Sequence, residues 1–375
     1  ILNTVVFPAP FGPISPYSIP FSIRIVKTVA DIPALEFLRS EQQMLRSVGP
    51  DGEAAVDAST IELTDDQIAQ IKEGGYTAAI CLHYGGNDWS TSQQKGLEDT
   101  FGELGIEIVA VTDANFSAET QVSNIETVMA KKPDILVSIP TDATATADAY
   151  KQAAAAGIKI VFMDQRADGL EAGKDYVSVV SADNYGNGYA SGTVLGDALG
   201  GKGKVAMVYY DANFAPTNQR DEGFRDAMKN YPDIEIVTEQ GFTDESGCAE
   251  QGDAILTQFP NIDGIYASWD VPMEGVLSAV RAAGMEGKVT LACNDLGNNV
   301  AREIASGNIA GGGAQMPYDQ GVAEAKLAAL ALLGEETPSY VAVPAETVTH
   351  ENVLEAYTDV YHVETPDWLK EAYVE

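Results

Sequence analysis

The chain has 375 residues, 45% of them hydrophobic, which suits two domains of ordinary size. No run reaches the roughly 18 apolar residues of a membrane-spanning helix, so we expect a soluble protein. The 56 acidic residues outnumber the 22 basic ones, and the net charge of −34 argues against nucleic-acid binding because such a surface repels phosphate backbones.

Residues 1–75 are predicted to form an N-terminal extension that is partly helical. Residues 1–30 are rich in proline and carry no basic segment before an apolar one, so we find no clear signal peptide. Two charged stretches, 34–48 and 64–74, have the pattern of helices. We expect this extension to pack on the domain that follows it.

From residue 76 onward, short apolar runs alternate with amphipathic stretches. The runs are rich in Val and Ile and most lack polar alternation, which is typical of strands buried on both faces of a parallel sheet. These predicted strands cover 77–82, 106–111, 134–139, 158–163, 176–180, 204–210, 234–237, 264–268 and 289–293.

The stretches between these runs carry helix signals. Ser117 stands where an N-cap is expected, and Gly157 stands at the position that ends a helix. Alternating strands and helices predict an α/β fold with right-handed crossovers. The number of strands favours two Rossmann-like lobes with parallel-rich sheets, each presenting its loops at the carboxyl ends of its strands.

Signals for catalysis or metal binding are weak. The three histidines form no close pair, and Cys81, Cys248 and Cys293 lack metal-site spacing. The sequence has neither a G-x-S-x-G elbow nor a phosphate-binding loop. The glycines of "GNGYASG" (186–192) fit a closely packed helix that begins at Asp183. We therefore predict no catalytic residue, no metal and no cofactor.

Polar and aromatic residues follow several of the predicted strands. The stretch "CLHYGGNDWS" (81–90) ends the first strand with Asn87 and Trp89, and His83 and Tyr84 precede them as residues that line the cleft or support the loop. Strand ends also supply the other candidates, which are Asp142, Asp164, Gln165, Trp269, Asp270, Asp295 and Gln315. Taken singly, an Asp such as Asp142 or Asp270 is more often a helix cap than a ligand contact.

Together, these residue types favour a neutral polyhydroxylated ligand. Carboxylates, amides and a guanidinium form paired hydrogen bonds with neighbouring hydroxyls, and Trp offers a flat apolar face to a sugar ring. The excess of Asp over Arg argues against a phosphorylated or strongly anionic ligand.

Residues 76 to about 350 resemble the periplasmic ribose-type sugar-binding proteins, and the resemblance rests on eight motifs in order. They are "NDWSTSQQKGL" (87–97), "SIPTDATAT" (138–146), "VFMDQR" (161–166), "SADNYGNG" (181–188), "TNQRDEGF" (217–224), "YASWDVPMEG" (266–275), "LACNDLG" (291–297) and "GAQMPYDQG" (313–321). Arg220 falls on the family's ligand-binding arginine, Asp295 on its aspartate and Gln315 on its glutamine. Gln165 replaces an arginine and Trp269 an asparagine, so the resemblance does not imply ribose itself.

The resemblance implies a type I periplasmic binding protein with a three-stranded hinge. The first lobe would hold residues 76–182 and 316–342, the second 183–315 and 343–362, and 363–375 would form a C-terminal tail that is a short surface helix or irregular. The implied function is capture of a neutral sugar or sugar alcohol by hinge closure and delivery to the membrane permease of an ABC importer. We expect a monomer in the periplasm or outside the cytoplasm.

Three alternatives remain at this point. A sugar-acting enzyme would use Asp164 and Asp295 as paired carboxylates. A signalling receptor would use the same two lobes as a sensor. A LacI-type repressor shares the fold but needs a basic DNA-binding helix, for which the acidic and proline-rich residues 1–75 offer no candidate.

Overall fold

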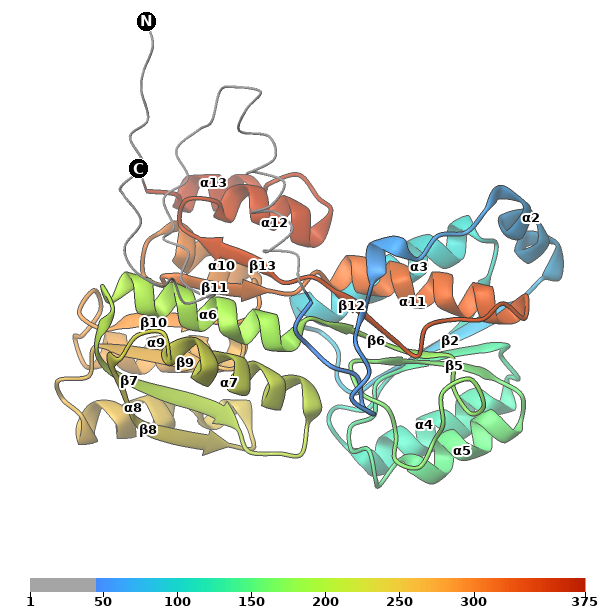
Figure 1. Cartoon of the computed structure of the whole chain (residues 1–375), viewed down its shortest axis with the longest axis horizontal. Coiled ribbons are helices and arrows are strands. Elements are labelled where there is room, and N and C mark those ends of the chain that lie inside the picture. The colour runs from blue at the N-terminus through green and yellow to red at the C-terminus, as the bar shows by residue number, and fades with distance from the viewer. Residues whose placement is uncertain (1–44, 375) are drawn as a thin grey trace, which may run out of the picture. The chain divides into compact units, whose positions relative to one another are not determined.

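The computed structural model describes residues 45–374, and within them the chain forms two sheets joined by three crossings (Figure 1). The α/β fold with parallel-rich sheets and a three-segment connection is therefore confirmed. The helix predicted over 34–48 lies mostly outside the described residues, and 45–48 are not helical. The helix predicted over 64–74 is present as α2 (Asp65–Gly74), which begins at the capping box of Thr64 and Gln67.

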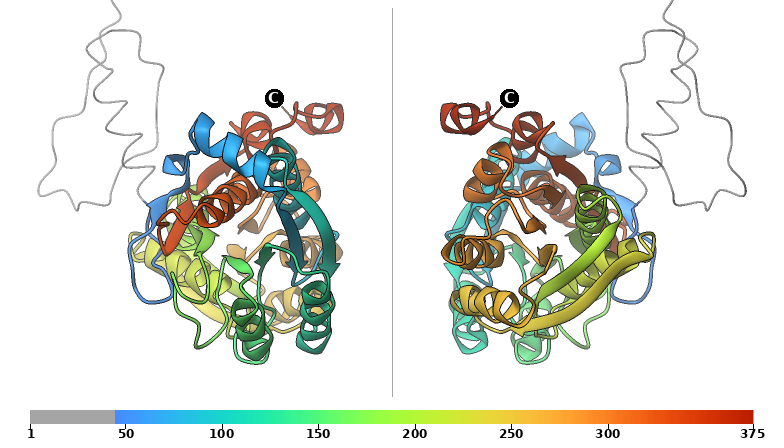
Figure 2. Two further views of the ribbon diagram at one scale, coloured as in Figure 1. Left: turned by 90° about the vertical axis from the view of Figure 1, so that its right-hand side faces the viewer. Right: turned by 90° about the vertical axis from the view of Figure 1, so that its left-hand side faces the viewer.

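The first sheet has seven strands, and each pairs in parallel with its neighbours. Its order is β1 (Val56–Asp57), β12 (Tyr340–Val343), β6 (Ser178–Ala182), β5 (Lys159–Met163), β4 (Ile135–Ser138), β2 (Thr77–Leu82) and β3 (Glu107–Asp113). Helices α3 (Asp88–Glu103) and α11 (Pro317–Leu332) cover one face, and α4 (Ala118–Ala130) and α5 (Ala147–Ala155) cover the other (Figure 2). Along β2, Ile80 and Leu82 point into the core under α3 and α11, whereas Ala79 and Cys81 point into the core under α4 and α5.

The second sheet has six strands, in the order β13 (Glu346–Thr349), β11 (Gly311–Ala314), β10 (Thr290–Cys293), β9 (Gly264–Ala267), β7 (Lys202–Tyr210) and β8 (Asp233–Phe242). Only the β11–β13 pair is antiparallel within this sheet. Helices α6 (Asn184–Ala198) and α7 (Ala215–Met228) pack on one face. The core of the other face takes residues from α8 (Cys248–Gln258), α9 (Asp270–Ala282), α10 (Asn298–Ala305), α12 (Val353–Tyr361) and α13 (Asp367–Ala372).

We call the layers around the seven-stranded sheet the first lobe and those around the six-stranded sheet the second lobe. The chain passes from one to the other between β6 and α6, between β11 and α11, and between β12 and β13 (Figure 1). Short connections of this kind let two lobes rotate about them, which is the usual construction of a hinge.

Local signals read from the sequence hold in the structure. The Ser117 hydroxyl accepts the backbone N–H of Thr120 at the start of α4, and Gly157 adopts a φ of +86° after α5. Asp183 caps α6 through the N–H of Gly186. A Cβ on Gly188 would lie 1.8 Å from the Arg220 carbonyl oxygen, so this glycine serves helix packing, as predicted.

Some elements of the structure were not predicted from the sequence pattern. Strands β1, β12 and β13 have two to four residues each and were not predicted as strands, and β8 extends well beyond the predicted 234–237. The C-terminal segment forms α13, whose Leu369 is fully buried in the second lobe. It is therefore an integral part of that core.

The segment 45–54 contacts both lobes. The buried Ser47 donates its backbone N–H and its hydroxyl to Asp183, each at 2.8 Å, while the Asp51 carboxylate pairs with Arg166 at 2.7 Å. The Val48 carbonyl oxygen accepts a hydrogen bond from Gln219 on α7. Within the predicted extension, the segment 45–54 therefore packs on the second lobe as well as on the first, where alone we expected contact.

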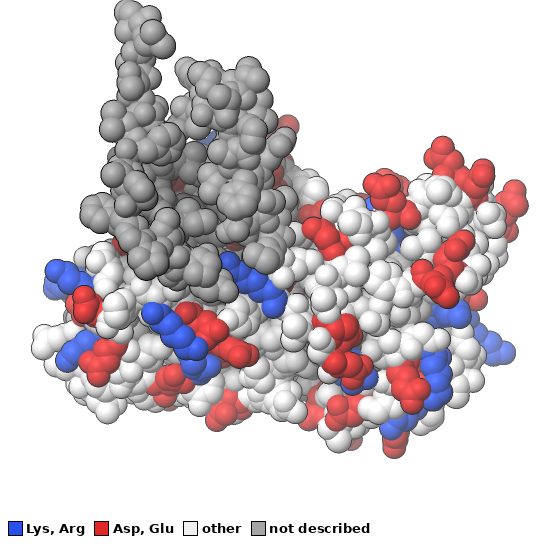
Figure 3. Space-filling view, viewed as in Figure 1, with Lys and Arg blue, Asp and Glu red and all other residues white. Residues whose placement is uncertain are grey.

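The acidic side chains are scattered over the face seen in Figure 3, with basic ones interspersed. Within residues 45–374, no helix has the length and apolar character needed to cross a membrane. In the same part of the chain, no group of three or more His, Cys, Asp or Glu side chains is arranged to hold a metal ion.

Candidate functional site

Two aspartates stand at the carboxyl ends of strands in different lobes. Asp164 follows β5 and Asp295 follows β10, and both have a left-handed backbone, with φ of +54° and +69°. Such a conformation is uncommon for residues other than glycine and is concentrated at functional sites. Both belong to the set of residues predicted from the strand ends.

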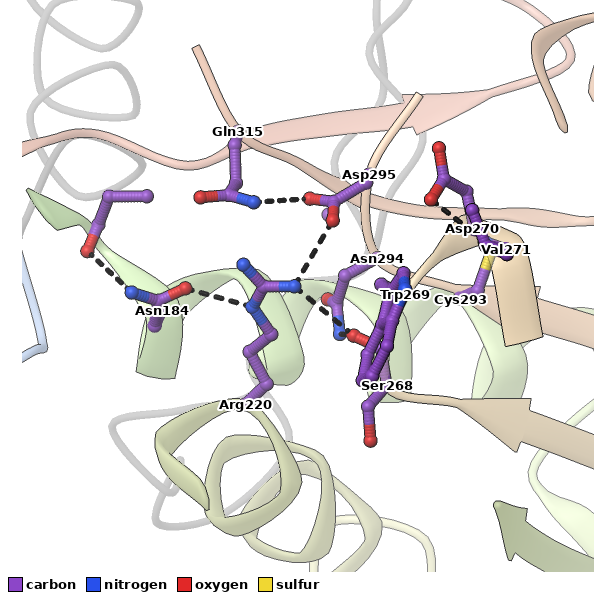
Figure 4. Close-up of polar contacts among 12 residues, drawn as sticks. Asn184, Arg220, Ser268, Trp269, Asp270, Val271, Cys293, Asn294, Asp295 and Gln315 are labelled. Atoms are coloured by element: carbon purple, nitrogen blue, oxygen red, sulfur yellow. Dashed lines mark hydrogen bonds and ion pairs between the residues drawn. The ribbon is translucent and has the colours of Figure 1, made fainter. Parts of the chain in front are cut away.

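Arg220 is the centre of the polar network in the second lobe (Figure 4). Its guanidinium is buried and forms an ion pair with Asp295 at 3.1 Å, and its Nε donates to Asn184 Oδ1 at 2.8 Å. The Gln315 amide donates to the other oxygen of Asp295 at 2.7 Å. Three predicted residues from α7, the β10 end and the β11 end are thus in direct contact.

Asn184 extends this network to the first lobe. Its amide nitrogen donates to the Ser181 hydroxyl at 2.9 Å, and that hydroxyl donates to Asp164 Oδ1 at 2.9 Å. Gln320, at the start of α11, donates to the same Asp164 oxygen at 3.2 Å. Burial raises the pKa of the Asp164 carboxyl, while the Ser181 bond and the charge of Arg220 oppose that rise.

A small cavity adjoins this network, with Trp89 in its wall. The cavity is lined by Trp89, Asp270, Asp295, Leu296, Gln315, Pro317, Val360 and Tyr361. The Trp89 indole N–H is buried and has no partner among the described residues, and the same holds for Gln315 Oε1. A donor and an acceptor are therefore left unpaired on residues of the cavity wall, which suits a ligand rich in hydroxyl groups.

Asp270 joins two elements of the second lobe beside the cavity. Its carboxylate accepts the backbone N–H of Val271 at 2.8 Å and that of Gly297, before α10, at 3.0 Å. Burial, and after it the charge of Asp295, raises the pKa of Asp270 well above its usual value. Asp270 therefore does not cap α9, whose N-cap is Trp269, and its carboxylate instead holds the turn before α10 at the cavity wall.

Trp269 belongs to the core of the second lobe. It is 7% exposed and packs against Tyr210 and Phe242, with ring centroids 5.6 and 5.1 Å away. Its indole N–H donates to Glu245 at 2.8 Å. Trp269 is therefore held by its own lobe and is not among the cavity-lining residues, unlike Trp89.

The remaining three candidates bond to nearby protein groups. Asn87 caps α3 through the N–H of Ser90, while the exposed Asp142 caps its own turn through the N–H groups of Thr144 and Ala145. Neither side chain has a hydrogen bond to the network around Arg220 among the described residues. Gln165 connects the lobes, because its amide donates to the Pro140 carbonyl and accepts the N–H of Ala215 at the start of α7.

His83 and Tyr84 form an aromatic cluster with residues of both lobes. The His83 ring packs edge-on against Tyr84 and Phe116 and stacks on Phe214, which precedes α7, at 5.8 Å. Burial lowers the pKa of His83 to about 3, so the ring is neutral at physiological pH. Its Nδ1 has no partner among the described residues.

Asn184, Ser181, Gln320 and Ser268 complete the site and were not predicted as site residues. Asn184 and Ser181 lie in the "SADNYGNG" stretch, which was assigned to the hinge alone, and Ser268 offers Arg220 its backbone carbonyl at 3.3 Å. The signal for Asn184 was its position two residues after a strand that leads from one lobe to the other.

Comparison with known proteins gives a consistent result. The family model of the periplasmic binding protein domain matches residues 78–336. The D-ribose/D-allose-binding protein of Pseudomonas aeruginosa is 29% identical over 273 residues, covering 70% of this chain and 83% of that protein. The ribose import binding protein of Salmonella typhimurium is 24% identical over 272 residues, covering 72% and 90%.

Solved structures with bound sugars have the same fold. A periplasmic solute-binding protein of an ABC transporter from Actinobacillus succinogenes, with bound D-allose, has a TM-score of 0.69 and 29% identity, covering 74% of this chain and 99% of that one. A solute-binding protein from Agrobacterium vitis, bound with α-D-tagatopyranose, has a TM-score of 0.71 and 25% identity, covering 78% and 100%.

Proposed function

We propose that this chain, which belongs to the periplasmic binding protein domain family, captures a neutral monosaccharide or sugar alcohol between its lobes. It then delivers this ligand to the permease of an ABC importer. The observation that carries this proposal is the continuous polar network from Asp164 through Ser181, Asn184 and Arg220 to Asp295 and Gln315. This network crosses from one lobe to the other beside a cavity walled by Trp89. The sugars named for the related proteins support the same ligand class.

The charges of the site favour a neutral ligand over an anion. Arg220 is already paired with Asp295, so its positive charge is compensated before any ligand enters. The buried Asp164 and the partly buried Asp270 add acidic groups around it. A phosphate brought into this site would meet more carboxyl groups than free cations, whereas hydroxyl groups can both donate to carboxylates and accept from Arg and Gln.

Hinge closure explains how such a site works in this family, for which that motion is established. The ligand contacts groups of both lobes and stabilises the closed arrangement through the contacts it makes there alone. Closure removes water from the cleft and strengthens each hydrogen bond in it. The closed protein then docks on the membrane permease from outside the cytoplasm.

A thermal-shift screen followed by calorimetry tests this proposal. D-ribose, D-allose, D-xylose, D-arabinose, D-tagatose and myo-inositol form the panel, and D-ribose 5-phosphate serves as the anionic control. We expect at least one neutral member to raise the melting temperature, because a ligand that binds the native state stabilises it, and the phosphate ester to leave it unchanged. No shift with any member would overturn the proposal.

The same panel of sugars also tests the alternative that the protein is an enzyme. The panel is incubated with protein at substoichiometric concentration and analysed by chromatography. We expect every sugar to be recovered unchanged, because Asp164 and Asp295 are both engaged by protein donors in the network. Product formation with many turnovers would replace the binding function by a catalytic one.

A further inference from the structure

A carboxyl group is buried between helices α3 and α11 of the first lobe. Glu324 on α11 is fully buried, as are Gln93 on α3 and Gln320 on α11. The two helices lie side by side (Figure 1), and they approach each other closely at two glycines. A Cβ on Gly321 would lie 2.3 Å from the Gln93 carbonyl oxygen, and one on Gly96 would lie 2.2 Å from that of Tyr318. This packing keeps the polar side chains between the helices away from bulk water.

The hydrogen bonds of these three side chains leave an excess of acceptors. Gln93 donates to Glu324 Oε1 at 2.6 Å, and Gln320 donates to Asp164 Oδ1 at 3.2 Å and to the Val180 carbonyl at 3.1 Å. The other oxygens, Gln93 Oε1, Gln320 Oε1 and Glu324 Oε2, have no partner among the described residues. A carboxyl proton on Glu324 would turn one of these acceptors into a donor.

We propose that Glu324 is a neutral carboxylic acid that donates its proton to the Gln320 carbonyl oxygen and thereby holds the Gln320 amide against Asp164. Gln320 and Glu324 stand four residues apart on α11, the spacing that brings helical side chains together. Glu324 is thus a positioning residue that acts through Gln320. This inference rests on the proposed function, because it assigns the positioned Asp164 to the sugar site.

Electrostatics support the protonated form. Burial, and after it the charge of Asp164, raises the pKa of Glu324 well above its usual value, although hydrogen bonding with Gln93 and Gln320 opposes that rise. The groups that face Glu324 are the neutral Gln93 from α3, the neutral Gln320 from α11 and Asp164 from the end of β5. Among the described residues, Asp164 is the ionisable group whose charge acts on Glu324, so ionisation would set two negative charges near each other.

The test compares Glu324→Gln, Glu324→Leu and wild-type protein, with Glu103→Gln on the exposed surface of α3 as the matched control. Glu324→Gln keeps the size of the side chain, a donor for Gln320 and an acceptor for Gln93, and has no proton to lose. Infrared difference spectra at neutral pH should show one protonated-carboxyl C=O band that is present in the wild type and in Glu103→Gln and lost from Glu324→Gln, because the bands of other carboxyls with a raised pKa, such as Asp270, cancel between wild type and variant. Persistence of that band in Glu324→Gln would overturn the protonated assignment.

Affinity for the best sugar of the panel provides the second measurement. We expect Glu324→Gln to bind within about twofold of wild type, and Glu324→Leu to bind about tenfold or more weakly because it leaves the Gln320 carbonyl unpaired and the amide free to turn. The wild-type affinity should fall at alkaline pH as Glu324 ionises, while that of Glu324→Gln stays level over the same range. Equal losses in the Gln and Leu variants, or identical pH profiles in wild type and Glu324→Gln, would refute the positioning role.

The two proposals fail in distinguishable ways. If wild-type protein binds no sugar at any pH, the proposed function falls and the positioning of a sugar-contacting Asp164 falls with it. The infrared band still decides whether Glu324 is protonated, because that measurement needs no ligand. If the sugar binds and the band is absent from wild type, the proposed function stands and the inference about Glu324 is overturned.

Discussion

Asp88 at the start of α3 and Asn298 at the start of α10 bind each other across the two lobes. The Asp88 carboxylate accepts the backbone N–H of Asn298 and its side-chain amide, each at 2.8 Å, although the two residues are 210 positions apart. The carboxylate of the first lobe thus caps a helix of the second lobe, where the helix dipole favours negative charge. The contact involves protein atoms alone and therefore favours closure without a ligand.

Asp88→Ala should shift the protein toward an open arrangement. Loss of the cap removes about 1 kcal/mol or more of closed-state stabilisation, which corresponds to a severalfold weaker sugar affinity. Small-angle scattering without ligand should give a larger radius of gyration for the variant, and saturating sugar should restore the wild-type value. Asp66→Ala, in the exposed first turn of α2, is the control and should change neither quantity. An unchanged radius and affinity in Asp88→Ala would show that this pair does not hold the lobes together.

Arg220→Ala should lower both affinity and stability. Its guanidinium is 6% exposed and pairs with Asp295, so Arg220 supports the lobe in addition to its proposed contact with the ligand. Removing one member of a buried ion pair leaves an uncompensated charge and costs about 3–5 kcal/mol of unfolding free energy. Urea denaturation and calorimetry measure the two effects.

The double variant Arg220→Met with Asp295→Asn separates these two effects. Because both charges are gone, most of the lost unfolding free energy should return. Sugar affinity should stay low, since both proposed ligand contacts are removed. Recovery of affinity along with stability would mean that the ion pair supports the lobe without contacting the sugar.

Trp89→Ala should mainly weaken sugar binding, whereas Trp269→Ala should mainly lower the stability of the fold. Trp89 is partly exposed and lines the cavity, so its loss should weaken sugar binding by about 1 kcal/mol and change the melting temperature little. Trp269 is buried against Tyr210 and Phe242, so its loss should cost about 3–5 kcal/mol of unfolding free energy. A large stability loss in Trp89→Ala with unchanged affinity would place that ring in the core of its lobe.

The sequence predicted those parts of the fold that depend on local pattern. Strands such as β2 and β5 are buried on both faces, so their residues form unbroken apolar runs. The glycines near Gly188 lie in a helix because they serve close packing with α7. Strands β12 and β13 have four residues each and depend on neighbours far along the chain, so they give no comparable signal.

Part of the candidate site could also be predicted from local sequence patterns. Asp295 and Gln315 follow strands, where sequence order alone predicts convergence at the strand ends, whereas Arg220 was predicted from the family resemblance. Glu324 and Gln320 lie within a helix, where a polar residue normally indicates a solvent-exposed face, and their burial follows from contact with α3. Asp88 stands between the two predicted residues Asn87 and Trp89. Its partner Asn298 is 210 positions away, so only the folded structure reveals the contact.

Asp221 should make the stability of the second lobe depend on pH near neutrality. It is buried and accepts hydrogen bonds from Ser268 at 2.6 Å and Tyr266 at 3.3 Å, and desolvation raises its pKa from 3.8 to about 6. The native state therefore binds a proton more tightly than the unfolded chain, so this contribution is fully present at low pH and is lost as pH rises to about 6 and above. The full pKa shift of Asp221 corresponds to about 2–3 kcal/mol of unfolding free energy.

Urea denaturation of wild type and Asp221→Asn at about pH 5 and about pH 8 measures the part of this contribution that is lost between those values, about 1.4 kcal/mol, with Asp66→Asn as control. Wild type should lose more stability than Asp221→Asn between these two pH values, and parallel pH profiles of the two proteins would assign the change to other groups.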